Sequence, residues 1–244
     1  MEILLGILFF VTAVLYSAVG FGGGSGYLAV MGLLSLPPEI MRPTSLALNM
    51  LVAGIGTWKH IRVGHFPGRL FWPISIISIP FAFIGGKLSL PAEFYRPVVG
   101  LILICAAVRL WLSARNHRQL EGKTAVLPFW IVILTGAAIG FVSGLVGVGG
   151  GIFLGPLLLL TGWANTRQTM SMTAAFVLVN SIAGLVGNVS VVQSLPAQLP
   201  FWLVTAGAGG WLGAELSARR LASLRLRQLL SAVLVTAALL MIFG

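Results

Sequence analysis

Long apolar runs separated by short polar connections are the dominant pattern along this chain. They cover residues 3–19, 25–36, 44–58, 70–90, 95–112, 127–146, 151–161, 170–189, 199–216 and 226–243. Because a helix of about 20 apolar residues spans the hydrocarbon core of a bilayer, the pattern predicts an all-α polytopic membrane protein with about 8 to 10 membrane segments. The runs at 25–36 and 151–161 are short for a full crossing, so we expect half-helices or re-entrant segments there.

Each of these two short runs follows a glycine-rich stretch. VGFGGGSG at 19–26 returns as VGVGGGIF at 146–153. Glycine in a helix interior is unfavourable by up to about 1 kcal/mol relative to alanine, so each stretch predicts a broken helix. The free N–H groups and the positive dipole end at the start of the next helix attract anions. The candidate substrate-binding residues are therefore Gly22, Gly23, Gly24, Ser25, Gly149, Gly150 and Gly151.

Close helix packing is the alternative explanation for glycine in a membrane helix. Gly136, Gly140 and Gly144 recur at every fourth position, a spacing that lets two helix backbones approach closely. Packing explains this stripe, but it does not explain three consecutive glycines, which point in three directions on one helix. A nucleotide-binding loop is excluded because no strand precedes either glycine triplet.

The similarity between the two halves extends beyond the glycines. IGGKLS at 84–89 returns as LGAELS at 212–217, which predicts two membrane repeats, residues 1–122 and 123–244, within one integral membrane domain. Basic residues gather in the loops near 59–69, 115–123 and 219–227, and the positive-inside rule places these loops in the cytoplasm. An odd number of crossings per half, or three crossings plus a re-entrant hairpin, then inverts the second repeat relative to the first.

Two asparagines lie inside apolar runs. Asn49 aligns with Asn180 when about four residues are inserted in the second half, and Ser181 follows directly. A buried amide needs hydrogen-bond partners, which a substrate cavity or a neighbouring helix can supply. Candidate accessory residues are Arg42, Thr44, Ser45, Arg167, Ser171 and Thr173. Anchoring at the membrane interface is the alternative role for the two arginines, and bonding within their own helix is the alternative for the hydroxyl residues.

Composition narrows the class of protein further. Hydrophobic residues make up 58% of the chain, charged residues 8%, and the mean hydropathy is +1.02, which excludes an ordinary soluble protein. The net charge of +10 is spread over short loops, so it indicates topology rather than nucleic-acid binding. The five acidic residues lie near the ends of the apolar runs, which leaves no carboxylate at mid-membrane. The sequence predicts no metal site, no cofactor and no enzymatic constellation.

The doubled GxGGG motif with a short apolar helix after it, LALN at 46–49 and FVLVNSIAGLVG at 176–187 resemble the sulfite exporter TauE/SafE family, also called the toluene-sulfonate uptake permeases. The resemblance covers essentially the whole chain. It implies a multi-pass protein of the bacterial plasma (inner) membrane that moves small sulfur-containing anions such as sulfite, sulfonates, sulfoacetate or thiosulfate. One departure is that Pro156 follows the second glycine run, whereas the first copy has Ala29.

We therefore predict a secondary transporter that holds a small anion between the two repeats and works by alternating access. An anion channel and a membrane scaffold without substrate are the alternatives. A coupling ion, H+ or Na+, leaves no signature in this sequence. The expected partners are the anionic substrate and the lipid bilayer, and a homo-oligomer is compatible with the chain.

Overall fold

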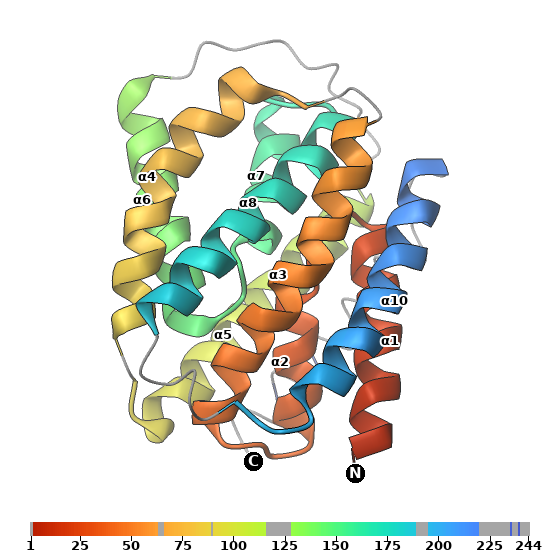
Figure 1. Cartoon of the computed structure of the whole chain (residues 1–244). Helices are drawn as coiled ribbons and strands as arrows, with labels where there is room; N and C mark the ends of the chain where they lie inside the picture. Colours follow the sequence, from red (N-terminus) through yellow and green to blue (C-terminus); the bar gives the residue numbers. More distant parts are fainter. Residues whose placement is uncertain are drawn as a thin grey trace.

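The computed structural model of the chain describes residues 2–62, 66–88, 90–115, 128–188 and 195–219 and the single positions 235 and 239. All regular secondary structure within these residues is helical, which confirms the predicted fold class. The helices are α1 (Glu2–Ala18), α2 (Gly24–Leu33), α3 (Pro38–Arg62), α4 (Gly68–Lys87), α5 (Ala92–Arg115), α6 (Phe129–Val146), α7 (Gly151–Thr161), α8 (Thr166–Gly187) and α10 (Leu199–Arg219) (Figure 1). The predicted segment at 226–243 lies outside the described ranges, apart from Val235 and Leu239.

The helix bounds follow the apolar runs closely, and α7 has the predicted bounds. The main difference is α3, which begins at Pro38, six residues before the predicted run at 44–58. Proline is favourable in the first turn of a helix because its missing N–H has no partner there in any case. The helix also includes polar residues at its far end, with Lys59, His60 and Arg62 in the last turn.

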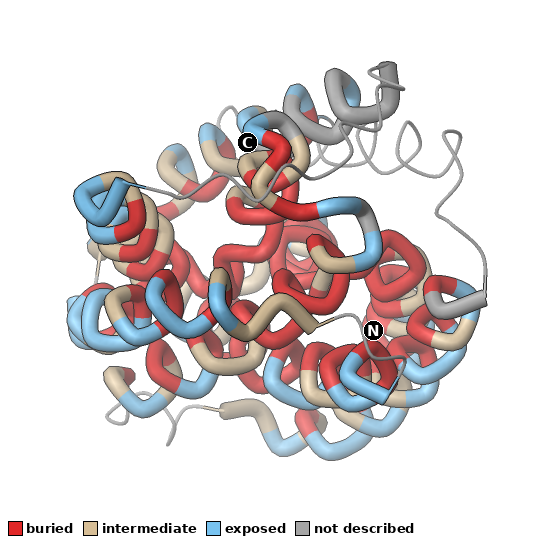
Figure 2. Tube along the Cα trace, turned by 90° about the horizontal axis from the view of Figure 1, so that it is seen from above, coloured by how far each residue is buried: buried red, intermediate tan, exposed pale blue. Residues whose placement is uncertain are grey.

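The outward faces of the bundle are apolar. In the view of Figure 2, buried positions gather at the centre of the bundle and exposed positions face outward. Large apolar side chains occupy many of the exposed positions, including Ile76 (63% exposed), Trp130 (65%) and Val204 (71%). An exterior with so many large apolar side chains suits lipid rather than water. Within the described residues, three helices are long and apolar enough to cross a membrane: α4, α6 and the segment Arg167–Gly187 of α8.

Two helical hairpins turn back inside the bundle. In Figure 1, α1 rises from the lower end and α2 returns to that end, where α3 begins. In the other half, α6 descends from the upper end and α7 returns to it, where α8 begins. The 10 residues of α2 give a length of about 15 Å, half of the roughly 30 Å hydrocarbon core. Both short helices are thus re-entrant halves, one of the two forms predicted for them.

The most extensive helix pairs are α4 with α6, α1 with α10 and α3 with α8. The predicted glycine stripe lies at the first of these contacts. A methyl group added at Gly136, Gly140 or Gly144 would collide with a carbonyl oxygen of α4, belonging to Ile74, Ser78 and Ala82 respectively. The packing interpretation of this stripe is confirmed. Gly209 and Gly213 of α10 approach the carbonyl oxygens of Phe10 and Val14 on α1 in the same way.

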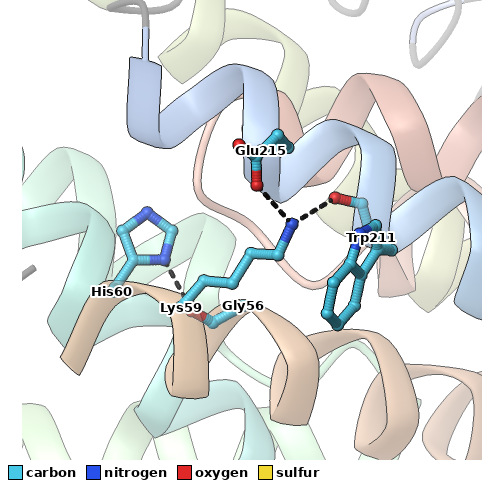
Figure 3. Close-up of polar contacts among 5 residues, drawn as sticks. All are labelled: Gly56, Lys59, His60, Trp211 and Glu215. Carbon is cyan, nitrogen blue, oxygen red and sulfur yellow. Dashed lines mark hydrogen bonds and ion pairs between the residues drawn. The ribbon is translucent and has the colours of Figure 1, made fainter. Parts of the chain in front are cut away.

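A polar contact joins α3 to α10 near one end of the bundle (Figure 3). The Lys59 side chain is only 7% exposed, and its ammonium lies 2.8 Å from a carboxylate oxygen of Glu215 and 2.9 Å from the carbonyl oxygen of Trp211. It also lies 4.1 Å from the centre of the Trp211 ring. On the next position of α3, the His60 ring nitrogen Nδ1 donates to the carbonyl oxygen of Gly56 at 2.7 Å. Lys59 therefore links a helix of the first half to a helix of the second.

Candidate functional site

Each glycine run breaks its hairpin through a left-handed glycine at the start of the returning helix. Gly23 precedes α2 with a φ of 103°, and Gly150 precedes α7 with a φ of 82°. Any residue with a β-carbon is strained in this region of backbone conformation, so the turn requires glycine there. The predicted breaks are present, and they lie at corresponding places in the two halves.

The helix starts after the two breaks are uncapped and buried. The backbone N–H groups of residues 22–26 and 148–152 form no hydrogen bond with any described residue, and no side chain caps Gly23 or Gly150. All ten of these residues are buried. The N-terminus of α8 is different, since Asn165 accepts from the N–H of Gln168 at 2.9 Å. Buried N–H groups require acceptors, so these helix starts need acceptor groups from outside the described residues.

The two breaks meet at the centre of the bundle. A methyl group added at Gly24, in the first break, would collide with Nδ2 of Asn49 and with the carbonyl oxygen of Val148 in the second break. A methyl group added at Gly149 would lie 3.0 Å from Nδ2 of Asn49 and 3.1 Å from Oγ of Ser181. The fold therefore brings the two predicted glycine triplets together with Asn49 and Ser181.

Asn49 lies between the breaks, and a hydrogen bond fixes the orientation of its side-chain amide. The residue is 0% exposed, and its Nδ2 donates to the carbonyl oxygen of Val148 at 3.2 Å. Since that oxygen accepts only, the amide nitrogen must face it and Oδ1 must face the other way. Oδ1 points to the first break, 3.0 Å from where a β-carbon of Gly22 would lie, and has no hydrogen-bond partner among the described residues.

Hydroxyl groups connect each break to a helix of the other half. Ser45 on α3 donates to the carbonyl oxygen of Gly147 at 2.8 Å. Thr173 on α8 lies 3.1 Å from the carbonyl oxygen of Gly20 and is also within reach of Thr169 in its own helix. Both residues were predicted as accessory, and both hold the backbone of a break rather than extend into open space.

These contacts set the register between the halves, and the predicted pairing of Asn49 with Asn180 is wrong. Ser45 and Thr173 occupy corresponding positions, and so do the first residues of α3 and α8, Pro38 and Thr166. No insertion is needed, and Asn49 then corresponds to Val177. Val177 indeed packs on Gly22 and Gly151. The sequence comparison paired the two asparagines because they are identical residues. The structure instead pairs residues that lie at the same distance from the starts of α3 and α8.

The remaining predicted polar residues have separate environments. Asn180 donates from Nδ2 to the carbonyl oxygen of Phe176 in its own helix at 2.9 Å, and its Oδ1 has no partner among the described residues. Ser25 donates to the Tyr16 hydroxyl at 3.2 Å. The hydroxyl groups of Thr44 and Ser171 are buried without a partner in the described part of the chain.

Arg42 packs its backbone and the start of its side chain on Gly147 of the second break, but its guanidinium group bonds elsewhere. Arg42 is 6% exposed and donates to four backbone carbonyl oxygens, those of Gly144, Gly85, Gly86 and Leu88. Its positive charge thus lies at the C-terminal end of α4, where the helix dipole favours a cation. Arg167 is exposed in the first turn of α8. The contacts of Arg42 favour a structural role, and anion capture by either arginine stays a prediction.

Two residues at the site escaped the sequence analysis. Tyr27 on α2 is fully buried, and its hydroxyl, which lies 2.8 Å from where a β-carbon of Gly23 would be, has no described partner. A hydroxyl within an apolar run one turn after a glycine triplet was the available signal. Val177 carries no polar signal, and only the register of α3 and α8 identifies it.

Apolar outward faces, re-entrant half-helices and a buried polar centre where two breaks meet define a polytopic α-helical membrane protein. The model of the Sulfite exporter TauE/SafE family matches residues 4–241. The chain belongs to this family, and it is a membrane transporter rather than an enzyme.

Relatives support the assignment along nearly the whole length of the chain. A protein named probable membrane transporter from Sinorhizobium fredii is 42% identical over 238 residues, covering 96% of each chain. Another probable membrane transporter, from Methanocaldococcus jannaschii, is 26% identical over 192 residues, 75% of this chain and 70% of its own. A third, from Bacillus subtilis, is 21% identical over 214 residues, 86% of this chain and 87% of its own. No solved structure matches the chain.

Proposed function

We propose that this transporter carries small sulfur-containing oxyanions of the sulfite, sulfonate, sulfoacetate or thiosulfate type, held between its two glycine breaks. The observation that carries the proposal is the pair of buried, uncapped helix starts at residues 22–26 and 148–152. An oxyanion offers several acceptor oxygens at once, and it would satisfy N–H groups from both breaks. The family name points to the same chemistry.

The site needs no charged side chain for this task. Backbone N–H groups at the positive ends of two helix dipoles stabilise negative charge without the desolvation of a buried cation. Arg42, a buried cation that packs on Gly147, is engaged by four carbonyl oxygens. The hydroxyl groups of Ser181 and Tyr27, both without described partners, are further donors that a bound anion would orient.

The two repeats, 1–122 and 123–244, are in this proposal inverted copies. Three features support it. The hairpin α1–α2 opens to one end of the bundle and α6–α7 to the other, and α3 and α8 run in opposite directions (Figure 1). In the pair α4–α6, a late helix of the first half packs on the first helix of the second half. In the pair α1–α10, the first helix of the first half packs on a late helix of the second. Alternating access then follows from movement of one repeat against the other around a fixed site.

Orientation in the membrane follows from the basic loops. The C-terminal ends of α3, α5 and α10, which lead into the three basic regions, point toward the same end of the bundle (Figure 1). We assign this end to the cytoplasm of a cell whose plasma membrane holds the protein. Because the site residues are buried, the substrate reaches them only when the helices around the breaks separate on one side.

Uptake of radiolabelled sulfite into proteoliposomes tests the proposal. Saturable uptake driven by a gradient is expected from the wild-type protein and from Thr57→Val, which removes a buried hydroxyl bonded only within α3. Ser181→Ala should raise the half-saturating concentration. Ohmic single-channel current would instead indicate an anion channel. A folded protein with neither flux nor stabilisation by any sulfur oxyanion or sulfonate would indicate a scaffold.

A further inference from the structure

A fully ionised anion would leave one buried acceptor beside the two breaks without a donor. The backbone N–H groups at residues 22–26 and 148–152 have no acceptor among the described residues. Beside them lies a side-chain acceptor, Oδ1 of Asn49; the residue is 0% exposed, and this oxygen has no partner among the described residues. Hydroxyl groups such as that of Ser181 rotate to donate or accept, but an amide oxygen only accepts.

The orientation of Asn49 makes this acceptor unavoidable. Turning the amide over would bring Oδ1 against the carbonyl oxygen of Val148, which now accepts from Nδ2 at 3.2 Å. Two acceptor oxygens would then face each other in a buried site. Asn49 therefore presents its oxygen toward Gly22, while its nitrogen faces Gly24 and the carbonyl oxygen of Val148.

Resting on the proposed function, we infer that Asn49 narrows the proposed substrate class to oxyanions that bind in a singly protonated form, such as hydrogen sulfite, ahead of sulfonates without an ionisable proton. Such an ion donates its O–H to Oδ1 of Asn49 while its other oxygens accept from the N–H groups of the breaks. A fully ionised dianion places lone pairs against Oδ1 and leaves that oxygen unpaired. A site built for a donor typically rejects an analogue that lacks it by a large factor.

This selection also bears on coupling. The acidic residues of the chain lie near the ends of its apolar runs, and none is available to carry a proton through the centre. A substrate that binds only in its protonated form brings its own proton with it. Transport of hydrogen sulfite then moves one proton and one sulfite dianion together, with the net charge of a monoanion.

Calorimetric titration of the purified protein tests the inference with sulfite at several pH values that bracket its second ionisation. We expect apparent affinity to fall as pH rises, while affinity calculated from the hydrogen sulfite concentration alone stays constant. Methanesulfonate, a monoanion without an ionisable proton, should bind about tenfold or more weakly and without pH dependence. Sulfite affinity that is unchanged or strengthened at high pH contradicts the inference alone. Binding of neither anion contradicts the proposed function as well.

Variants of Asn49 test whether its acceptor oxygen, rather than the packing of its side chain, sets the selectivity. Asn49→Leu removes the acceptor and should bring the affinities for hydrogen sulfite and methanesulfonate within about twofold of each other, which a purely structural role would not do. Asn49→Ser keeps a small polar group for the case in which leucine prevents folding, and it should reduce the discrimination in the same direction. Thr57→Val, on the same helix, should retain the wild-type preference. Unchanged discrimination in a folded Asn49 variant contradicts the inference.

Discussion

Ser45 in the first half of the chain donates a hydrogen bond of 2.8 Å to the carbonyl oxygen of Gly147 in the second. The corresponding hydroxyl of the other half, that of Thr173, lies 3.1 Å from the carbonyl oxygen of Gly20. Each glycine break is thus held by a helix of the opposite repeat. In the proposed transport cycle, movement of one half of the chain against the other would therefore change the shape of both breaks at once.

The Ser45 contact should matter for both stability and transport. Ser45→Ala leaves the Gly147 carbonyl oxygen without this donor, and we expect it to lower the free energy of unfolding by about 1 kcal/mol. Thermal unfolding in detergent measures this change, and Ser78→Ala is the matched control because that hydroxyl bonds within its own helix. Uptake by the Ser45 variant should also fall. Equal melting temperatures for the two variants would contradict the role assigned to Ser45.

The register of the halves predicts that the two asparagines are not equivalent. Asn49 contacts both breaks, whereas Asn180 donates within its own helix and corresponds to no asparagine in the first half. Asn49→Leu should weaken substrate binding by about tenfold or more, and Asn180→Leu by less. Binding affinity measured for both variants with one labelled anion decides this. Equal losses of affinity in the two variants would contradict this and support the equivalence of Asn49 and Asn180 predicted from the sequence.

The sequence predicted more of the fold than of the candidate site. Apolar runs predicted the helices, and the glycine triplets predicted both breaks, because glycine and hydrophobicity act locally. The start of α3 at Pro38 was missed since Arg42 looks polar until its carbonyl partners are known. Those partners lie 43 to 102 residues away along the chain. The role of Val177 was also invisible, because only three-dimensional register relates it to Asn49.

Arg42 should act on stability rather than on anion affinity. Arg42→Met removes four hydrogen bonds to backbone carbonyl oxygens at the ends of α4 and α6, so we expect a loss of at least about 2 kcal/mol in the free energy of unfolding. Arg69→Met, at an exposed position of α4, should change it by less than about 0.5 kcal/mol. Thermal unfolding compares the two. A stable Arg42→Met protein that has lost anion binding would contradict this and show that Arg42 contributes to anion binding.

The glycine stripe on α6 should tolerate no added carbon. Gly140→Ala pushes a methyl group against the carbonyl oxygen of Ser78, so the helices α4 and α6 must separate, at about 1 to 3 kcal/mol. Gly54→Ala is the control, since its methyl group would meet only Leu178 at 3.8 Å. Yield of monodisperse protein and melting temperature report the difference. Similar values for both variants would show that the stripe is not a tight contact.

The position of the bound anion tests whether it binds between the two glycine breaks. Crystals of the purified protein soaked with selenite, a heavier analogue of sulfite, give an anomalous signal at the selenium position. We expect a peak between the two breaks, within hydrogen-bond distance of N–H groups from both 22–26 and 148–152 and close to Oδ1 of Asn49. A well-occupied peak elsewhere, such as beside Arg167, with none at the breaks, would contradict it.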